Sequence, residues 1–288
     1  MSSQATTLKR MTYSDMDESG LRVLAVSSGK GGVGKTTTSV NLCASLVAYK
    51  KRVLLIDLDP QGNATMGSGI NKQSCNLSVY HILTGKSSTA EAIVHSDSGK
   101  YDVLPANRDL VAAEVELMKE IGRESRLKIA LNEVEENYDY IIIDCPPTLN
   151  MLTVNALVAS EGVIIPMQCE YFALEGLADL NNTIKQIAKL INPKLYIQGI
   201  LRTMYDPRSS LTNAVTAQLR KYFGDRVYRV SIPRNVRLAE APSHGLPALM
   251  YDRNSKGSMA YLALAGEILR LEKQQQQQQQ STATAKAQ

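Results

Sequence analysis

The stretch from Ser27 to Ser39, SSGKGGVGKTTTS, contains residue types that hold phosphate groups. Its pattern Gly29-x-x-x-x-Gly34-Lys35-Thr36 is a complete P-loop, in which glycines let backbone N–H groups turn toward phosphate oxygens. A helical pattern follows the loop, so the positive end of a helix adds to the site. We expect Lys35 to reach the β- and γ-phosphates and the Thr36 hydroxyl to ligate Mg²⁺. The residues predicted to bind the nucleotide are Gly29, Lys30, Gly31, Gly32, Val33, Gly34, Lys35, Thr36 and Thr37.

A second lysine, Lys30, lies near the start of the loop and is not required by this chemistry. It comes too early to act as Lys35 does on the same nucleotide. Spacing leaves two interpretations open. Lys30 is a solvated loop residue, or it contacts the phosphates of a second subunit and stabilises transition-state charge as an arginine finger does.

Three aspartates follow apolar runs that are typical of buried strands. Asp57 and Asp59 end the run VLLIDLD, where alternate residues share a face. Asp144 ends the run YIIID, which is the Walker B pattern. Because open α/β sheets bind ligands at the carboxyl ends of their strands, we expect Asp144 on the Mg²⁺ side of the site. Of Asp57 and Asp59, one is expected to hold Mg²⁺ through water and the other to orient the attacking water. The predicted metal-side residues are Thr36, Asp57 and Asp144.

Apolar runs alternate with helical patterns along the chain, which predicts an α/β fold: a mostly parallel twisted sheet with helices on both faces. We expect one domain over residues 21–273, preceded by a flexible polar arm at 1–20. The last helix is predicted at 258–273. Seven glutamines follow it, so residues 274–288 are predicted to be a disordered glutamine-rich tail. The candidate strands are 21–27, 53–59, 103–104, 140–144, 162–166, 197–203 and 227–232, and the clearest helices are 173–191 and 211–223.

Composition excludes several classes of protein. The four cysteines are scattered and form no C-x-x-C pair, which argues against a local zinc or iron–sulfur motif. The N-terminus has no apolar core and no apolar run is long enough to span a membrane. We therefore expect a cytoplasmic protein with reduced thiols and no membrane partner.

At this point the motifs indicate a family. KGGVGKTT with its early lysine, DLDPQGNAT and IIIDCPP resemble the deviant-Walker P-loop ATPases, which include ParA/Soj, MinD and the nitrogenase iron protein. The likeness extends from about residue 21 to residue 271. Four later segments are similar to the chromosomal ParA/Soj branch, namely 104–117, 169–180, 203–215 and 232–245.

The resemblance implies a Mg²⁺-dependent ATPase that forms a nucleotide-sandwich homodimer, in which Lys30 crosses the interface. It implies catalytic roles for Lys30, Lys35 and Asp59, the last in setting up hydrolysis. The ATP-bound dimer of that family binds double-stranded DNA without sequence preference, and a ParB-type centromere-binding partner stimulates hydrolysis and releases it. The cycle segregates or positions chromosomal or plasmid DNA, so we expect a nucleoid-associated protein. The resemblance also implies that the adenine base of ATP is contacted by residues 203–206 and by Pro233 and Asn235.

The segment from Arg202 to Arg237 supports DNA binding independently. It holds eight basic residues against two aspartates, a local net charge of +6 in a chain of +4. Such an excess suits phosphate contacts, which are blind to sequence. In the helix 211–223, a stripe of Leu211, Val215, Leu219 and Phe223 is predicted to be buried. The predicted DNA-binding residues are Arg208, Arg234 and Arg237.

Other functions remain open. A MinD-like or other cargo-positioning ATPase is the main alternative, but membrane binding would need a basic amphipathic C-terminal helix. The helix 258–273 carries few cations and resembles a core-packing helix. A nucleotide-gated DNA-binding scaffold, for which hydrolysis hardly matters, is a second alternative.

Overall fold

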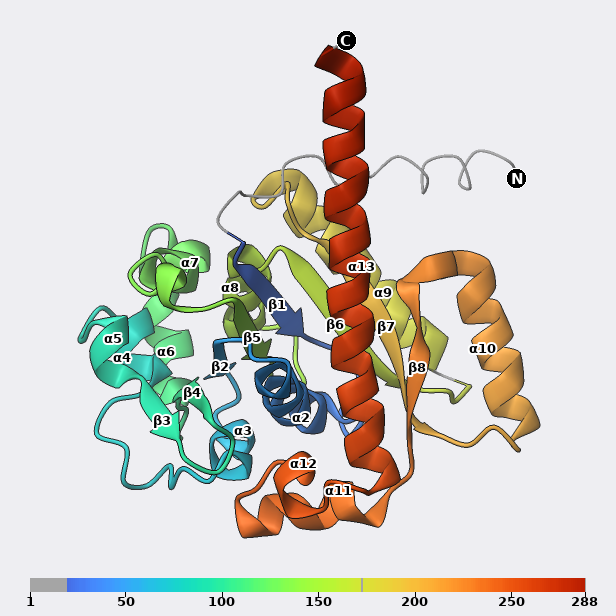
Figure 1. Cartoon of the computed structure of the whole chain (residues 1–288). Helices are drawn as coiled ribbons and strands as arrows, with labels where there is room; N and C mark the ends of the chain where they lie inside the picture. Colours follow the sequence, from blue (N-terminus) through green and yellow to red (C-terminus); the bar gives the residue numbers. More distant parts are fainter. Residues whose placement is uncertain (1–19, 172, 288) are drawn as a thin grey trace.

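The computed structural model describes residues 20–171 and 173–287. The predicted arm at 1–20 therefore lies outside the described residues except for Gly20. Eight strands form one sheet in the order β3-β4-β2-β5-β1-β6-β7-β8 (Figure 1). The strands are β1 (Arg22–Val26), β2 (Val53–Asp57), β3 (Val94–Ser96), β4 (Tyr101–Leu104), β5 (Tyr140–Asp144), β6 (Gly162–Gln168), β7 (Tyr196–Tyr205) and β8 (Val227–Pro233).

Helices connect most of these strands. The α-helices are α2 (Lys35–Ala48), α3 (Asn63–Gly67), α4 (Val79–Leu83), α5 (Thr89–Ala92), α6 (Leu110–Leu117), α7 (Arg126–Leu131), α8 (Met151–Ala159), α9 (Ala173–Leu190), α10 (Ser210–Phe223), α11 (Val236–Glu240), α12 (Ala248–Tyr251) and α13 (Lys256–Ala287). The short 3₁₀ turns are η1 (Arg123–Ser125), η2 (Glu135–Asn137), η3 (Gly224–Arg226) and η4 (Ala241–His244).

The predicted α/β class is confirmed, because every strand pairing in the sheet is parallel except that between β3 and β4. The edge strand β3 was not predicted. It has three residues, two of them exposed, so its sequence VHS carries no buried-strand pattern.

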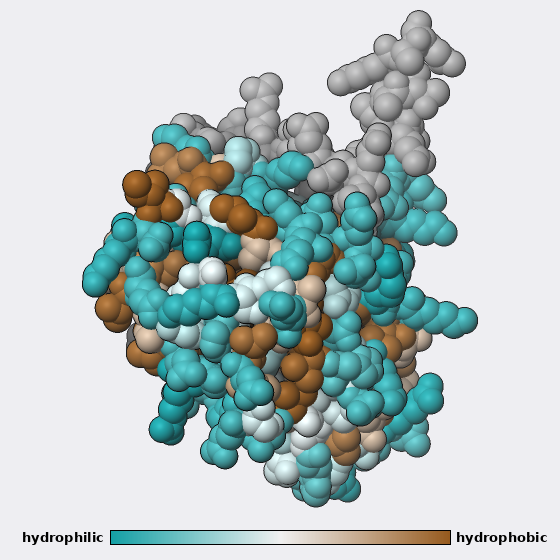
Figure 2. All heavy atoms as spheres, turned by 90° about the vertical axis from the view of Figure 1, so that its left-hand side faces the viewer, coloured by the Kyte–Doolittle hydropathy of each residue, from teal (hydrophilic) through white to brown (hydrophobic). Residues whose placement is uncertain are grey.

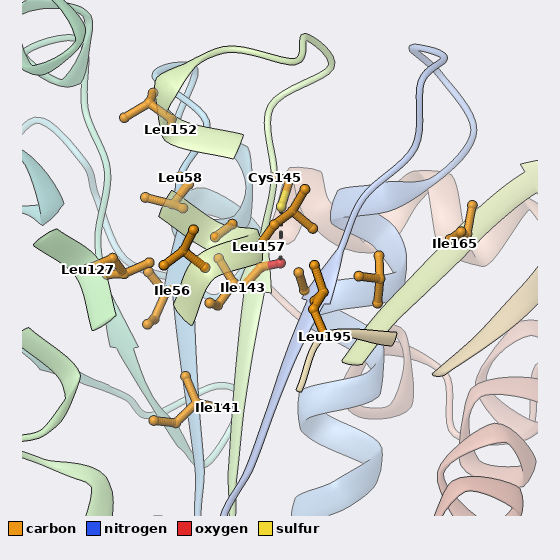
Figure 3. Close-up of a cluster of buried hydrophobic side chains, with 14 of the residues drawn as sticks. Ile56, Leu58, Leu127, Ile141, Ile143, Cys145, Leu152, Leu157, Ile165 and Leu195 are labelled. Atoms are coloured by element: carbon orange, nitrogen blue, oxygen red, sulfur yellow. Dashed lines mark hydrogen bonds between the residues drawn. The ribbon is translucent and has the colours of Figure 1, made fainter. Parts of the chain in front are cut away.

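Helices cover both faces of the sheet, and alternate residues of each strand supply two separate cores. In β5, Ile141 and Ile143 enter one core with the helices α4 and α6–α10, while Ile142 enters the other with α2 and α13. Figure 3 shows Ile143 with Leu127 of α7 and Leu157 of α8 in the first of these cores. Both faces of the sheet are therefore covered by helices.

The carboxyl ends of the parallel strands lie along one edge of the sheet. In the register of the central strands, Asp144 at the end of β5 lies beside Val26 at the end of β1 and beside Asp57 at the end of β2. The P-loop follows Val26 directly. The strand order therefore brings the three predicted site segments together.

The C-terminal helix differs from its predicted form. α13 begins two residues before the expected start and continues through 274–287, where the sequence predicts a disordered tail. Glutamine and alanine are good helix formers, and extending an existing helix avoids the cost of nucleation. The predicted core-packing role is confirmed, since Tyr261, Leu264 and Ile268 are buried in the core shared with α2. The end of α13 extends beyond the body of the protein (Figure 1).

The predicted buried stripe of α10 is wrong at one position. Leu211 is 45 % exposed, whereas Val215 and Leu219 are buried as expected. Thr212 and Thr216 are buried in its place. A pattern of strictly apolar residues leaves threonine out, although its methyl group packs well, and therefore places the apolar face slightly off its true direction.

The side of the molecule that carries α4–α7 shows apolar patches among polar residues (Figure 2). Helix α6 contributes to the exposed apolar surface, because Val111, Val115 and Met118 are each more than half exposed. Its opposite side packs Leu110 and Leu117 into the core. In the described part of the chain, no helix combines the length and apolar character needed to cross a membrane.

Candidate functional site

The P-loop joins the end of β1 to the start of α2, as predicted from the pattern. Gly32 and Gly34 have φ angles of 73° and 87°, in the left-handed region that favours glycine. Gly34 is the N-cap of α2, and Lys35 is the first residue of that helix. A Cβ added at Gly31 or Gly32 would meet nothing within 4 Å, so open space borders the loop. Loop and helix end together form an anion cradle.

Lys35 lies inside this cradle and is 8 % exposed. Its Nζ donates to the carbonyl oxygen of Lys30 at 3.3 Å. Burial lowers the pKa of Lys35, although the charges of Asp144 and Asp59 oppose that change.

Asp144 is fully buried at the base of the cradle. Its two carboxylate oxygens accept hydrogen bonds from the hydroxyls of Thr36 and Ser39, each at 2.8 Å. Burial raises the pKa of Asp144, and the charge of the neighbouring Asp57 raises it further, while the two hydroxyl bonds act in the opposite direction. Ser39 was missed in the sequence, although its spacing of three residues from Thr36 places both hydroxyls on one side of α2.

Asp57 is also fully buried, but its partners lie within its own segment. One oxygen accepts bonds from the backbone N–H and the hydroxyl of Thr65, both at 2.8 Å, and the other accepts from the N–H of Asp59 at 3.1 Å. These bonds hold the start of α3 against the end of β2. The predicted water-mediated Mg²⁺ role of Asp57 must therefore coexist with a structural one.

Asp59 is partly exposed, and its Oδ1 accepts a bond from the N–H of Gln61 at 2.9 Å. Its charge acts to raise the pKa of both Lys35 and Asp144. Of the two candidate carboxylates, Asp59 is the more accessible and is suited to orient a water molecule.

The oxygen atoms at this site suit a Mg²⁺ ion that is held mainly by a nucleotide. Among the described residues, no group of three or more His, Cys, Asp or Glu side chains forms a metal cluster. Mg²⁺ usually keeps several waters and binds one or two protein oxygens together with phosphates. The hydroxyl of Thr36, held by the buried carboxylate of Asp144, is such a protein ligand.

A cavity of about 430 Å³ adjoins Gly34, between the P-loop and the ends of β7 and β8. Thr203, at the end of β7, donates from its hydroxyl to the carbonyl oxygen of Val33 at 2.8 Å and so ties the loop to the sheet. Pro233 and Asn235, both predicted in the sequence, line this cavity. The side-chain oxygen of Asn235 is buried and has no hydrogen-bond partner among the described residues. The cavity thus lies directly beside the phosphate-binding loop.

Lys30 points away from this cavity into an ion pair. Its Nζ lies 2.7 Å from Glu170 Oε2, and each of the two side chains is 48 % exposed. The sequence did not indicate Glu170 as a partner, because the two residues lie 140 positions apart.

The three predicted DNA-binding arginines are all exposed. Arg208 pairs with Asp206 at 2.9 Å, and Arg237 pairs with Glu240 at 2.7 Å and with Asp252 at 3.3 Å. Arg234 also lines the cavity beside the P-loop.

Arg202 does not belong to the predicted basic surface. It is 3 % exposed, and its guanidinium donates to the carbonyl oxygens of Tyr228 and Arg229 at 2.9 and 3.0 Å. It joins β7 to β8. Counting charges along the sequence could not separate this structural arginine from the exposed ones.

The chain is similar to known proteins over most of its length. Residues 21–197 match a family described as an AAA domain. The chain is 53 % identical over 247 residues to the sporulation initiation inhibitor protein Soj of Bacillus subtilis (strain 168), covering 86 % of this chain and 98 % of Soj. It is 48 % identical over 260 residues to the chromosome partitioning protein ParA of Caulobacter vibrioides, covering 90 % and 97 %.

The fold is also similar to a solved enzyme. The crystal structure of cobyrinic acid a,c-diamide synthase from Mycobacterium smegmatis, with bound ADP and magnesium, matches with a TM-score of 0.77 and 38 % sequence identity. The match covers 88 % of this chain and 96 % of that one. A protein of this fold thus binds a nucleotide with magnesium.

Proposed function

Because this chain belongs to the ParA/Soj family of chromosome-partitioning ATPases, we propose that it hydrolyses ATP with Mg²⁺ and binds DNA without sequence preference as an ATP-bound dimer. A ParB-type partner then stimulates hydrolysis and releases the dimer from DNA. The observation that carries the ATPase assignment is the buried carboxylate of Asp144, which receives the hydroxyls of Thr36 and Ser39 beside a complete P-loop.

We assign each residue of the cradle a separate role in phosphoryl transfer. The N–H groups at the start of α2 and the amine of Lys35 bind the β- and γ-phosphates. Asp144 orients the Thr36 hydroxyl, which is the proposed ligand of Mg²⁺. The ion, when bound, neutralises charge on the phosphate oxygens. Asp59 orients the attacking water toward the γ-phosphate.

Pro233 and Asn235 are the proposed contacts to the adenine base in this scheme. Both residues line the cavity that adjoins Gly34 of the P-loop, next to the backbone that binds the phosphates.

The proposed DNA surface comprises Arg208, Arg234 and Arg237. Two of these are held in exposed ion pairs, which contribute little and are readily exchanged for DNA phosphates. A MinD-like membrane ATPase is less well supported, because α13 packs its apolar residues into the core. The solved synthase is also less similar in sequence than Soj.

The deciding experiment measures binding to a random-sequence DNA duplex with ATP, with ADP and without nucleotide, at a low and a high salt concentration. We expect binding with ATP only, weakened by salt, and steady-state hydrolysis that increases when DNA and a ParB-type partner are both present. Binding that is equal in all three nucleotide states would reject an ATP-gated DNA dimer. A fluorescent fusion tests nucleoid association separately.

A further inference from the structure

Three contacts join the P-loop to the connection between β6 and α9. The first is the ion pair between Lys30 and Glu170 at 2.7 Å. In the second, Gln168 donates from its side-chain nitrogen to the carbonyl oxygen of Gly32 at 3.1 Å. The third is a close approach of two backbones. We name Gln168, Glu170 and Gly176 the β6–α9 clasp.

The close approach of two backbones is that between Gly29 of the P-loop and Gly176 of α9. A Cβ added to Gly29 would lie 3.0 Å from the carbonyl oxygen of Gly176, in the first turns of α9. Few side chains tolerate such a contact, so the start of the P-loop and the start of α9 lie directly against each other.

We propose that Glu170 is a positioning residue that holds Lys30 within its own subunit until a second subunit binds. This inference rests on the proposed nucleotide-dependent dimer. Lys30 must leave Glu170 before its ammonium group reaches the phosphates of a neighbouring subunit. The triphosphate carries more negative charge than one carboxylate, so bound nucleotide in the partner is the stronger acceptor. The pair thus opposes dimerisation until that charge is present.

The size of this restraint follows from its exposure. Both side chains are half exposed, and a pair of this kind shifts an equilibrium by a few-fold. Two such pairs break when one dimer forms. Removing Glu170 is therefore expected to lower the dimer dissociation constant by about 3- to 30-fold.

The test is Glu170→Gln, which keeps the shape of the side chain and removes its charge. The matched control is Glu175→Gln, an exposed carboxylate in the first turn of α9. Sedimentation of each protein with a non-hydrolysable ATP analogue gives the dimer dissociation constant. We expect Glu170→Gln to dimerise more tightly than wild type and Glu175→Gln to match wild type.

A second measurement does not depend on dimerisation. The rate at which an amine-reactive reagent labels Lys30 in nucleotide-free monomers is read by mass spectrometry. We expect a rate 2- to 5-fold higher in Glu170→Gln than in wild type or Glu175→Gln, because the pair shields the amine. Unchanged labelling shows that the pair does not restrain Lys30 and overturns the proposal.

Weaker or unchanged dimerisation of Glu170→Gln, beside a wild type that does dimerise, also overturns it. Failure of the wild type to dimerise with the analogue rejects the proposed dimer instead, while the labelling rate still decides whether Glu170 holds Lys30.

Discussion

The Thr36 hydroxyl donates to the Asp144 carboxylate at 2.8 Å, although the two residues are 108 positions apart. Ser39 donates to the second oxygen, so one buried carboxylate ties the first turn of α2 to the end of β5. Asp57 lies beside Asp144 in the sheet, and burial raises the pKa of Asp57 to about 6. Two buried carboxylates side by side destabilise the fold where both are ionised. The pair of carboxylates therefore favours binding of a cation at the cost of the stability of the folded protein.

Asp144→Asn is expected to make the protein more stable and less active. The raised pKa means that the folded state binds protons that the unfolded state has released. The stability of the wild type is therefore highest below the unfolded pKa and falls as the pH rises from about 4 through the folded pKa. The stability of the variant does not fall in this way, because its amide does not ionise. We therefore expect its free energy of unfolding to be about 1–3 kcal/mol higher than that of the wild type at pH near 8 without Mg²⁺. The hydroxyls of Thr36 and Ser39 can rotate to suit the amide.

Urea unfolding of wild type and Asp144→Asn at pH near 5 and near 8 measures this difference, and ATP hydrolysis is followed in parallel. The gain in free energy of unfolding should be smaller at the lower pH. An equal or reduced stability at the higher pH contradicts the view that Asp144 is held in an unfavourable ionised state.

Lys35→Ala is expected to abolish ATP-dependent dimerisation, because the β- and γ-phosphates lose their principal cation. Sedimentation with and without ATP measures the loss. The fold should be retained, since the amine of Lys35 makes one long bond of 3.3 Å to the backbone of its own loop. Dimers as abundant as in wild type would mean that the loop backbone alone suffices.

Asp59→Ala is expected to bind ATP and dimerise but to hydrolyse slowly, by about 10²–10⁴-fold in rate, since the attacking water is no longer oriented. The trapped dimer should stay on DNA. Single-turnover hydrolysis and DNA dissociation rates measure both effects. Normal turnover would shift the catalytic role to another carboxylate, and Asp57 would be substituted next.

Arg208→Glu and Arg237→Glu are each expected to weaken DNA binding and leave ATP-dependent dimerisation intact. Each lost phosphate contact should reduce the log–log salt dependence by about one unit. Asp206→Asn is the matched control, because it frees Arg208 from its ion pair and should strengthen DNA binding slightly. If both arginine variants bound DNA as wild type does at every salt concentration, the DNA surface would lie elsewhere.

Lys30→Ala is expected to bind ATP as a monomer but fail to form the dimer, with DNA binding and stimulated hydrolysis lost together. Mixing it with Lys35→Ala tests supply from the neighbouring subunit. In the mixed dimer, the Lys30→Ala subunit keeps its own Lys35 and receives Lys30 from its neighbour, which completes one site. Activity above the sum of the two variants is the expected result. Wild-type dimerisation and hydrolysis by Lys30→Ala alone would leave Lys30 a solvated loop residue.

Local patterns were sufficient for the fold class and for the phosphate-binding loop. The alternation of apolar runs with helical spacing predicted the mostly parallel sheet. The polar residues that follow the apolar runs of β1, β2 and β5 indicated that the site lies at the carboxyl ends of these strands. These features depend on neighbours in the chain, which the sequence shows directly. The extension of α13 beyond residue 273 was missed, because a low-complexity composition does not state whether a preceding helix continues.

Tertiary structure alone decided which distant residues meet. The order β2-β5-β1-β6 places the ends of four strands side by side, and so brings Ser39 to Asp144 and Glu170 to Lys30. The pairing of β7 with β8 likewise buries Arg202, whose guanidinium donates to the backbone carbonyl oxygens of Tyr228 and Arg229 and not to a ligand. Separation along the chain carries no information on such pairs. Partners more than a hundred residues apart are set by strand order and register, which arise from the packing of the whole sheet and its two helical layers.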